Sequence, residues 1–189
     1  MRPTKASDMA ALSVRRPPGH FLWTSVFLLL IFIQMSTSLL CFGGVFIRSK
    51  EAVISPYQFC PAQQHGYLSC NGWDRSVVTG AESKITINIL RQLVILSLYI
   101  PVVLVAFALL AMLFAAYARD RAAYWFSMAC QAASSLLFMT GIIGFLVLNQ
   151  SYVSWEHMTT WFYICVGVQV QLVVTTVLTF VSRKKCDWE

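Results

Sequence analysis

The sequence predicts an all-α membrane protein, a four-helix transmembrane bundle that carries a small, disulfide-stapled extracellular β-sheet. Three observations predict this fold class. Hydrophobic residues make up 58% of the chain and charged residues 12%, whereas soluble domains carry about 25% charged residues. The apolar residues are concentrated in four long runs, and the longest polar interval, at 48–84, contains two cysteines. We therefore expect one membrane domain over 21–182.

The four runs contain no Asp, Glu, Lys or Arg and cover 21–47, 92–118, 122–155 and 157–182. Each is longer than the roughly 20 residues that a helix needs to cross the hydrocarbon core. A backbone in lipid must satisfy its own hydrogen bonds, so continuous apolar runs of this length predict helices. The expected helices cover about 21–47, 85–118, 122–148 and 159–182, with an outer loop over 48–84.

The basic residues predict the orientation. Because short segments rich in Lys and Arg stay in the cytosol, we expect a multi-pass protein of the plasma membrane with both termini cytosolic. Residues 1–20 are then a disordered cytosolic leader, and 183–189 are a cytosolic tail. Topology accounts for the net charge of +6, so the expected charged partner is the lipid bilayer and not nucleic acid. Nine of the 14 basic residues lie on the predicted inner side: Arg2, Lys5, Arg15, Arg16, Arg119, Arg121, Arg183, Lys184 and Lys185.

The first apolar run also has features of a signal peptide. Arg15 and Arg16 would form its basic region, 21–33 its apolar core and 36–38 a small-residue cleavage site. Apolar character continues beyond that site as far as Phe46. We favour a spanning helix on this length criterion.

The outer loop alternates short apolar pieces with turn-forming residues, a pattern typical of a small antiparallel sheet. Cys60 and Cys70 would lie across a hairpin that turns near His65. Outside the cell such a pair is expected to be oxidised, and closing so short a loop contributes about 2–3 kcal/mol. The alternative is a metal site with His65 and His157. Structural zinc needs four well-placed ligands, so we favour the disulfide and expect no metal.

No sequence feature indicates a reaction. The helices carry no ionisable residue deep in the membrane, whereas pumps and intramembrane proteases depend on such residues. The chain also lacks a phosphate-binding glycine loop and a nucleophile elbow. We expect no enzymatic activity, no cofactor and no small-molecule substrate. Cys186 follows three basic residues beyond the last helix and is either a palmitoylation site or a free thiol.

Several positions resemble a known family. The chain is similar to the claudin and peripheral myelin protein 22 superfamily, which includes the epithelial membrane proteins and the calcium-channel gamma subunits. Cys60 and Cys70 match its cysteine pair, and Tyr57 stands where the family has the Trp of Gly-Leu-Trp. Arg91 matches the basic residue that opens the second helix, and Trp155 precedes the fourth helix as in the family. The altered Gly-Leu-Trp motif identifies a divergent member.

The resemblance implies a left-handed bundle with the outer sheet packed on the helix ends. Tyr57 and Phe59 would dock this sheet, and Arg91 would donate hydrogen bonds to loop carbonyls. In claudins the outer surface forms paracellular barriers or pores at cell junctions, and in the gamma subunits it contacts a channel or receptor. The resemblance therefore implies a surface that binds another protein.

The sequence predicts a non-enzymatic multi-pass protein that acts through its extracellular loop. Its partners would be other integral membrane proteins or itself, in cell–cell or lateral contacts. The alternative is an accessory subunit of a channel or receptor. A small-molecule channel or transporter is less favoured, because the helices carry no charge. Trp73 is the main candidate for a partner contact, since exposed aromatic residues are enriched at interfaces. The other candidates are Tyr67, Asp74 and Arg75.

Overall fold

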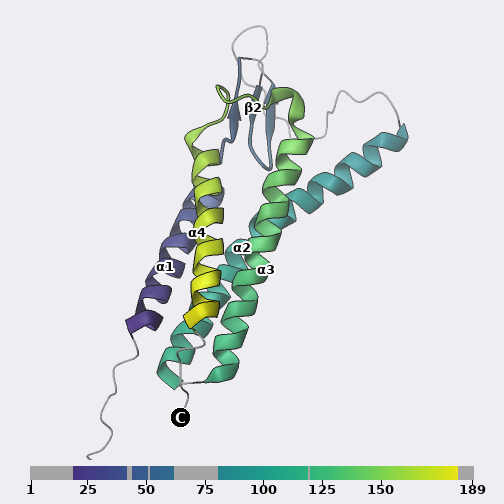
Figure 1. Cartoon of the computed structure of the whole chain (residues 1–189). Coiled ribbons are helices and arrows are strands. Elements are labelled where there is room, and N and C mark those ends of the chain that lie inside the picture. Colours follow the sequence, from purple (N-terminus) through teal and green to yellow (C-terminus); the bar gives the residue numbers. More distant parts are fainter. Residues whose placement is uncertain (1–18, 42–43, 51, 62–80, 119, 183–189) are drawn as a thin grey trace, which may run out of the picture.

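The computed structural model describes residues 19–41, 44–50, 52–61, 81–118 and 120–182. It consists of four long helices with a small sheet at one end of the bundle (Figure 1). The helices are α1 (Gly19–Ser36), continued by a π-helical turn η1 (Thr37–Cys41), α2 (Ala81–Ala118), α3 (Arg121–Leu148) and α4 (Thr160–Ser182), with a short 3₁₀ turn η2 (Gln150–Tyr152). The strands are β1 (Ile47–Arg48), β2 (Ala52–Ile54) and β3 (Phe59–Pro61). The predicted combination of four helices and a small antiparallel sheet is confirmed.

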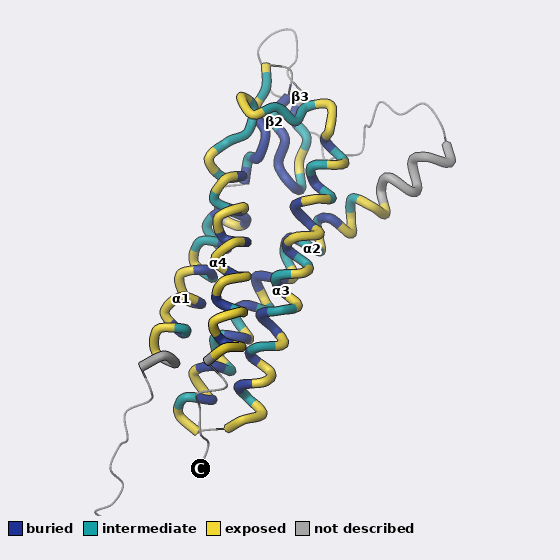
Figure 2. Tube along the Cα trace, in the orientation of Figure 1, coloured by how far each residue is buried: buried dark blue, intermediate teal, exposed yellow. Residues whose placement is uncertain are grey.

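All four helices are long and apolar enough to cross a membrane, over Leu22–Leu40, Ile89–Ala118, Arg121–Leu148 and Thr160–Val181. The exposed residues follow the outward faces of the helices, while the buried ones face the bundle interior (Figure 2). Many of the exposed residues are large and apolar, as a surface in contact with lipid requires. The chain is therefore a multi-pass membrane protein.

Exposed aromatic residues mark both ends of the bundle. Trp23, Tyr117 and Trp125 lie near the end that holds the α2–α3 connection, and Trp155 and Tyr163 lie at the opposite end. Trp and Tyr concentrate at the two membrane–water interfaces, because their rings are apolar and their tips are polar. These two groups support a position of the bundle that spans the bilayer.

The first helix is shorter than the sequence predicts. Its last turn ends at Cys41, whereas Ile47, the predicted helix end, lies in β1. Gly44 adopts a positive φ of 41°, and a Cβ there would lie 2.8 Å from the Ser38 carbonyl oxygen. Only glycine adopts this backbone readily. Phe46 and Ile47 are both fully buried, Phe46 just before β1 and Ile47 within it, so the prediction mistook a protein-facing segment for a lipid-facing one.

The other helix boundaries lie close to the predicted ones. α2 begins at Ala81, a turn before the predicted start at 85, while α3 and α4 begin within one residue of their predicted starts. Asp120 caps α3, because its carboxylate accepts a hydrogen bond from the Ala122 amide at 2.9 Å. Such a cap satisfies a backbone donor at the helix start. It allows α3 to begin directly after the short connection from α2.

The sheet has the strand order β1-β2-β3, and both strand pairs are antiparallel. Ser49 and Ser55 close the two turns in the same way. The Ser49 hydroxyl accepts a hydrogen bond from the Ala52 amide, and the Ser55 hydroxyl accepts one from the Gln58 amide, both at 3.0 Å. The predicted apolar piece at 53–54 is confirmed as strand β2. The predicted hairpin around His65 lies outside the described residues.

Candidate functional site

The two outer segments of the chain form one unit above the bundle. Residues of the second segment, between α3 and α4, pair with the free edge of β1. Ile47 forms a β-bridge with Met158, and the Arg48 amide donates to the His157 carbonyl at 2.8 Å. This pairing adds a fourth element to the sheet. We call β1, β2, β3 and residues 150–159 the outer platform.

Thr159 links the outer platform to the bundle. Its amide donates to the Phe46 carbonyl at 3.0 Å, and its hydroxyl donates to the Val45 carbonyl. Its own carbonyl accepts from the Phe162 amide at 3.1 Å, within the first turn of α4. A single residue thus joins the segment after α1 to the start of α4. Nothing in the sequence signals this role, because the contact joins residues more than 100 positions apart.

Aromatic packing holds the outer platform down on the helix ends. Phe46 is fully buried, and its ring makes edge-to-face contacts with Phe145 of α3 and Phe162 of α4, at centroid distances of 5.1 Å and 5.9 Å. Within the outer platform, the ring of Phe59 in β3 packs on the ring of Tyr152 in η2, at a centroid distance of 5.9 Å. The family resemblance implied docking by Tyr57 and Phe59. In the structure Tyr57 lies in the turn between β2 and β3, and the central docking residue is Phe46.

The other predicted site residues fall into two groups. Cys60 is buried in β3 opposite Val53 of β2, and Arg91 is partly buried in α2. The family resemblance implied that Arg91 opens the second helix, but Arg91 lies ten residues after the start of α2. The pairing of Cys60 and the bonds of Arg91 to loop carbonyls stay predictions. Within the described ranges, no group of three or more His, Cys, Asp or Glu side chains is placed to hold a metal. The remaining predicted site residues lie outside the described residues: Tyr67, Cys70, Trp73, Asp74, Arg75 and Cys186.

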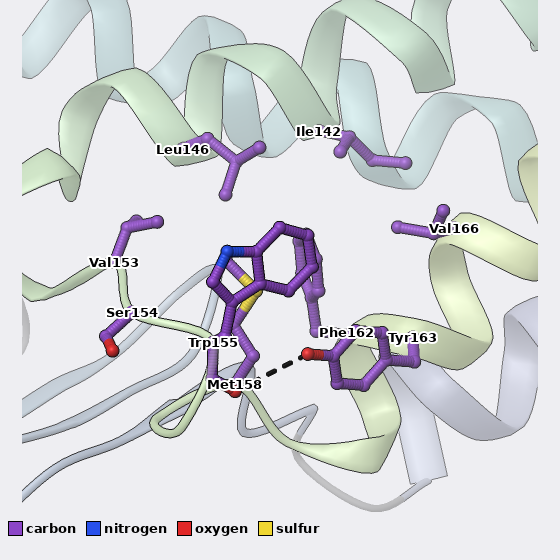
Figure 3. A pocket seen from close by; sticks show the side chains of 9 residues that line it. All are labelled: Ile142, Leu146, Val153, Ser154, Trp155, Met158, Phe162, Tyr163 and Val166. Carbon is purple, nitrogen blue, oxygen red and sulfur yellow. Dashed lines mark hydrogen bonds between the residues drawn. The ribbon is translucent and has the colours of Figure 1, made fainter.

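An apolar groove of about 550 Å³ lies directly below the outer platform, between α3 and α4. Figure 3 shows the Trp155 indole reaching over this groove toward Leu146 and Ile142 of α3. The Tyr163 hydroxyl donates to the Trp155 carbonyl at 3.5 Å, and the Trp155 side chain remains 82% exposed. Trp155 was expected to be structural, but its exposure leaves most of its ring available to lipid or to another protein. The full lining consists of Ile142, Leu146, Val153, Ser154, Trp155, Met158, Phe162, Tyr163 and Val166.

A chain of buried hydrogen bonds connects α2, α3 and α4 deeper in the bundle. The Ser127 hydroxyl donates to the Ala108 carbonyl at 2.7 Å and accepts from the Gln131 amide at 3.2 Å. The Gln131 carbonyl oxygen accepts from Thr179 at 3.2 Å, and the Tyr124 hydroxyl donates to the Thr179 backbone carbonyl. Hydrogen bonds between membrane helices contribute about 0.6 kcal/mol each, and up to roughly 2. Gln131 thus packs between α3 and α4.

The chemistry of these interior groups is that of helix packing. They are hydroxyls and amides that bond to one another and to backbone carbonyls. Gln169 behaves in the same way, since its side-chain amide donates to the Ser135 carbonyl at 3.1 Å. The outer platform and the lipid-facing helix surfaces are therefore the parts of the described structure that are accessible to a partner.

No known protein family model matches the chain, and no curated protein is significantly similar to it.

Replacing Thr159 with valine should lower the stability of the outer platform by about 0.5–1.5 kcal/mol, because it removes a hydrogen bond to the partly buried Val45 carbonyl while the side-chain shape is kept. Thermal unfolding in detergent measures the effect. Thr160→Val is the matched control, since Thr160 is exposed at the start of α4. Equal unfolding midpoints for the two variants would contradict the role assigned to Thr159.

Proposed function

We propose that this chain is a non-enzymatic protein of the plasma membrane that acts through its outer loop. Its partners are other integral membrane proteins or further copies of itself, bound laterally or from a neighbouring cell. Both termini face the cytosol in this arrangement, as the distribution of basic residues predicts. The bundle serves as an anchor that holds the outer platform at a fixed height above the membrane.

One observation carries this proposal: two outer segments distant in sequence are joined into a single platform. The bridge between Ile47 and Met158, the bonds of Thr159 and the burial of Phe46 all act at this junction. A surface held by backbone pairing and buried rings keeps one shape when it meets a partner. Such preorganisation lowers the entropic cost of binding.

The family resemblance adds expectations about details. We propose a divergent member of the claudin and peripheral myelin protein 22 superfamily, with a left-handed bundle and a Cys60–Cys70 disulfide. Cys60 is buried in β3 at the sheet edge opposite β1. A bond to Cys70 would tie residues 62–80, which contain the candidate contact residues, to that edge.

The groove below the outer platform favours a second candidate, an accessory subunit of a channel or receptor. The groove lies within the membrane-facing part of α3 and α4, and Trp155 beside it is largely exposed. Aromatic residues over apolar grooves are typical anchors of protein interfaces. A partner bound here would lie beside the protein in the same membrane.

The proposal is tested by replacing Trp73 with alanine in cells. We expect a normal surface level and a clear loss of captured partner, measured by cross-linking on intact cells and affinity purification in mild detergent. Cys60→Ser and Cys70→Ser should lower the surface level equally, with no further loss in the double variant, because each removes the same bond. If Trp73→Ala is retained inside the cell like the cysteine variants, Trp73 is structural and the contact role is wrong.

The location of the native protein in cells and the proteins that co-purify with it distinguish the two candidate functions. A protein that binds across cell contacts should be enriched where two expressing cells meet. An accessory subunit should show no such enrichment and should co-purify with one channel or receptor, and Trp155→Ala should then weaken that co-purification more than Trp73→Ala does.

A further inference from the structure

An amide side chain faces outward near the middle of a membrane span. Gln171 lies halfway along the Thr160–Val181 span of α4 and is exposed. Its neighbours Val170 and Val174 on the same face are also exposed. Half of the hydrocarbon core is about 15 Å thick, too far for a glutamine side chain to reach water. The Gln171 amide is therefore exposed to hydrocarbon in a single copy of the chain.

This amide differs from the interior glutamines of α3 and α4. Gln131 and Gln169 donate hydrogen bonds to Ser127 and Ser135. The backbone carbonyl of Gln171 accepts a hydrogen bond from Thr175 at 2.8 Å, but among the described residues its side chain has no partner. A polar group in hydrocarbon is strongly disfavoured unless it is hydrogen-bonded. Within the described part of this copy nothing satisfies the Gln171 amide, so a group from a second molecule is the partner to look for.

Gly167 lies one turn before Gln171 on the same face. A Cβ at Gly167 would have no heavy atom within 4 Å, so nothing inside the bundle requires a glycine at this position. Small residues on membrane helices allow a second helix to approach closely, and glutamine side chains then bond across the contact. We call Gly167, Val170, Gln171 and Val174 the Gln171 face.

We propose that two copies of this chain associate side by side in the membrane through the Gln171 face of α4. All copies insert into the membrane with the same orientation. A two-fold axis along the membrane normal then places two α4 helices side by side and parallel, with each residue at the same depth as its counterpart. The Gln171 side chain carries both donors and an acceptor, so two of them satisfy one another. A second copy of the chain carries the same glutamine at the same depth, so it supplies this hydrogen-bond partner.

The interaction surface is separate from the outer platform and does not depend on a partner bound there. The groove lining on α4 begins one turn before the Gln171 face, because Tyr163 and Val166 precede Gly167 and Val170 by four residues. A dimer would thus present two outer platforms together. Two linked sites raise the avidity for a clustered or repeated partner.

The test measures association of the full chain in liposomes. Purified protein labelled with donor or acceptor dyes is reconstituted at decreasing protein-to-lipid ratios, and energy transfer reports the dimer. Gln171→Leu should weaken association about 3- to 20-fold, as expected for loss of an interhelical hydrogen bond, while Gln171→Asn should retain most of it. Val103→Leu, on the exposed face of α2, is the control and should associate like the native chain.

Cross-linking locates the contact. Gln171→Cys in a Cys186→Ser background should form a disulfide-linked dimer on oxidation, and Val103→Cys in the same background should not. Thermal unfolding of each variant in detergent checks that the bundle is intact, as expected for substitutions at exposed positions. Native chains that show no energy transfer at any ratio overturn the proposal. Gln171→Leu that associates like the native chain, or equal cross-linking at positions 103 and 171, overturns it as well.

Discussion

Replacing Gly141 with leucine is expected to separate α2 from α3 and to leave little folded protein. A Cβ at Gly141 would lie 2.9 Å from both Cγ and Cδ2 of Leu98 and 3.1 Å from the Leu98 backbone nitrogen. Gly144 stands one turn later, where a Cβ would lie 2.6 Å from Val94 Cγ2. The two helices therefore approach closely along this seam. Overpacking a core with single groups costs about 1–3 kcal/mol, and a leucine pressed against backbone should exceed that range.

The measurement is the folded fraction after detergent extraction, together with the thermal unfolding midpoint. Gly167→Leu is a closely matched control, because it makes the same substitution in a membrane helix at a glycine that faces open space. The comparison is made in dilute detergent, where the copies of the chain are separated. There Gly167→Leu should be at least as stable as the native chain, because glycine is disfavoured in helices by up to about 1 kcal/mol. Equal losses at the two positions would contradict the close contact of α2 and α3 at Gly141.

Replacing Phe46 with alanine is expected to lower stability by about 3–5 kcal/mol, the range for removing a phenyl ring from a packed core. Phe46 is fully buried, and its ring contacts Phe145 and Phe162 edge to face. Its backbone also contributes to the sheet, through a hydrogen bond from its amide to the Ile54 carbonyl at 2.9 Å. The substitution keeps the backbone pairing but removes the ring that anchors the outer platform.

Limited proteolysis of the outer side, in intact vesicles, distinguishes loss of the outer platform from loss of the whole protein. We expect faster cleavage of the outer segments in Phe46→Ala while the four helices remain in the membrane. Phe107→Ala provides the control, because Phe107 is half exposed on α2 and faces lipid. If both variants are cleaved at the native rate, Phe46 does not hold the outer platform to the bundle.

The four spans were predictable because their signal is local. Each run lacks charge for longer than the thickness of the bilayer, and no other structure satisfies the backbone in lipid. The ends of α2, α3 and α4 lie near their predicted positions because polar or turn-forming residues stand beside them. The presence of a small antiparallel sheet was also readable, since short apolar pieces alternate with turn-forming residues such as Ser55, which closes the turn between β2 and β3.

The outer platform depended on contacts between distant segments. Phe46 and Ile47 have the same hydropathy whether they face lipid or are buried in the protein, so the sequence placed them in the first helix. Only the fold brings β1 against His157 and Met158. Hydropathy describes a residue's preference for an apolar environment, and it does not say whether that environment is lipid or protein.

The two glutamines of α4 also separate what the sequence determines from what the tertiary structure decides. Gln169 and Gln171 stand two residues apart in this helix. Their separation of two positions turns the side chains about 200° apart on a helix, so they cannot both face the bundle interior. The sequence by itself determined that one of the pair points away from the other. The packing of α4 against α3 decided that Gln169 bonds to Ser135 and that Gln171 faces outward, because that choice depends on which side of α4 the neighbouring helices cover.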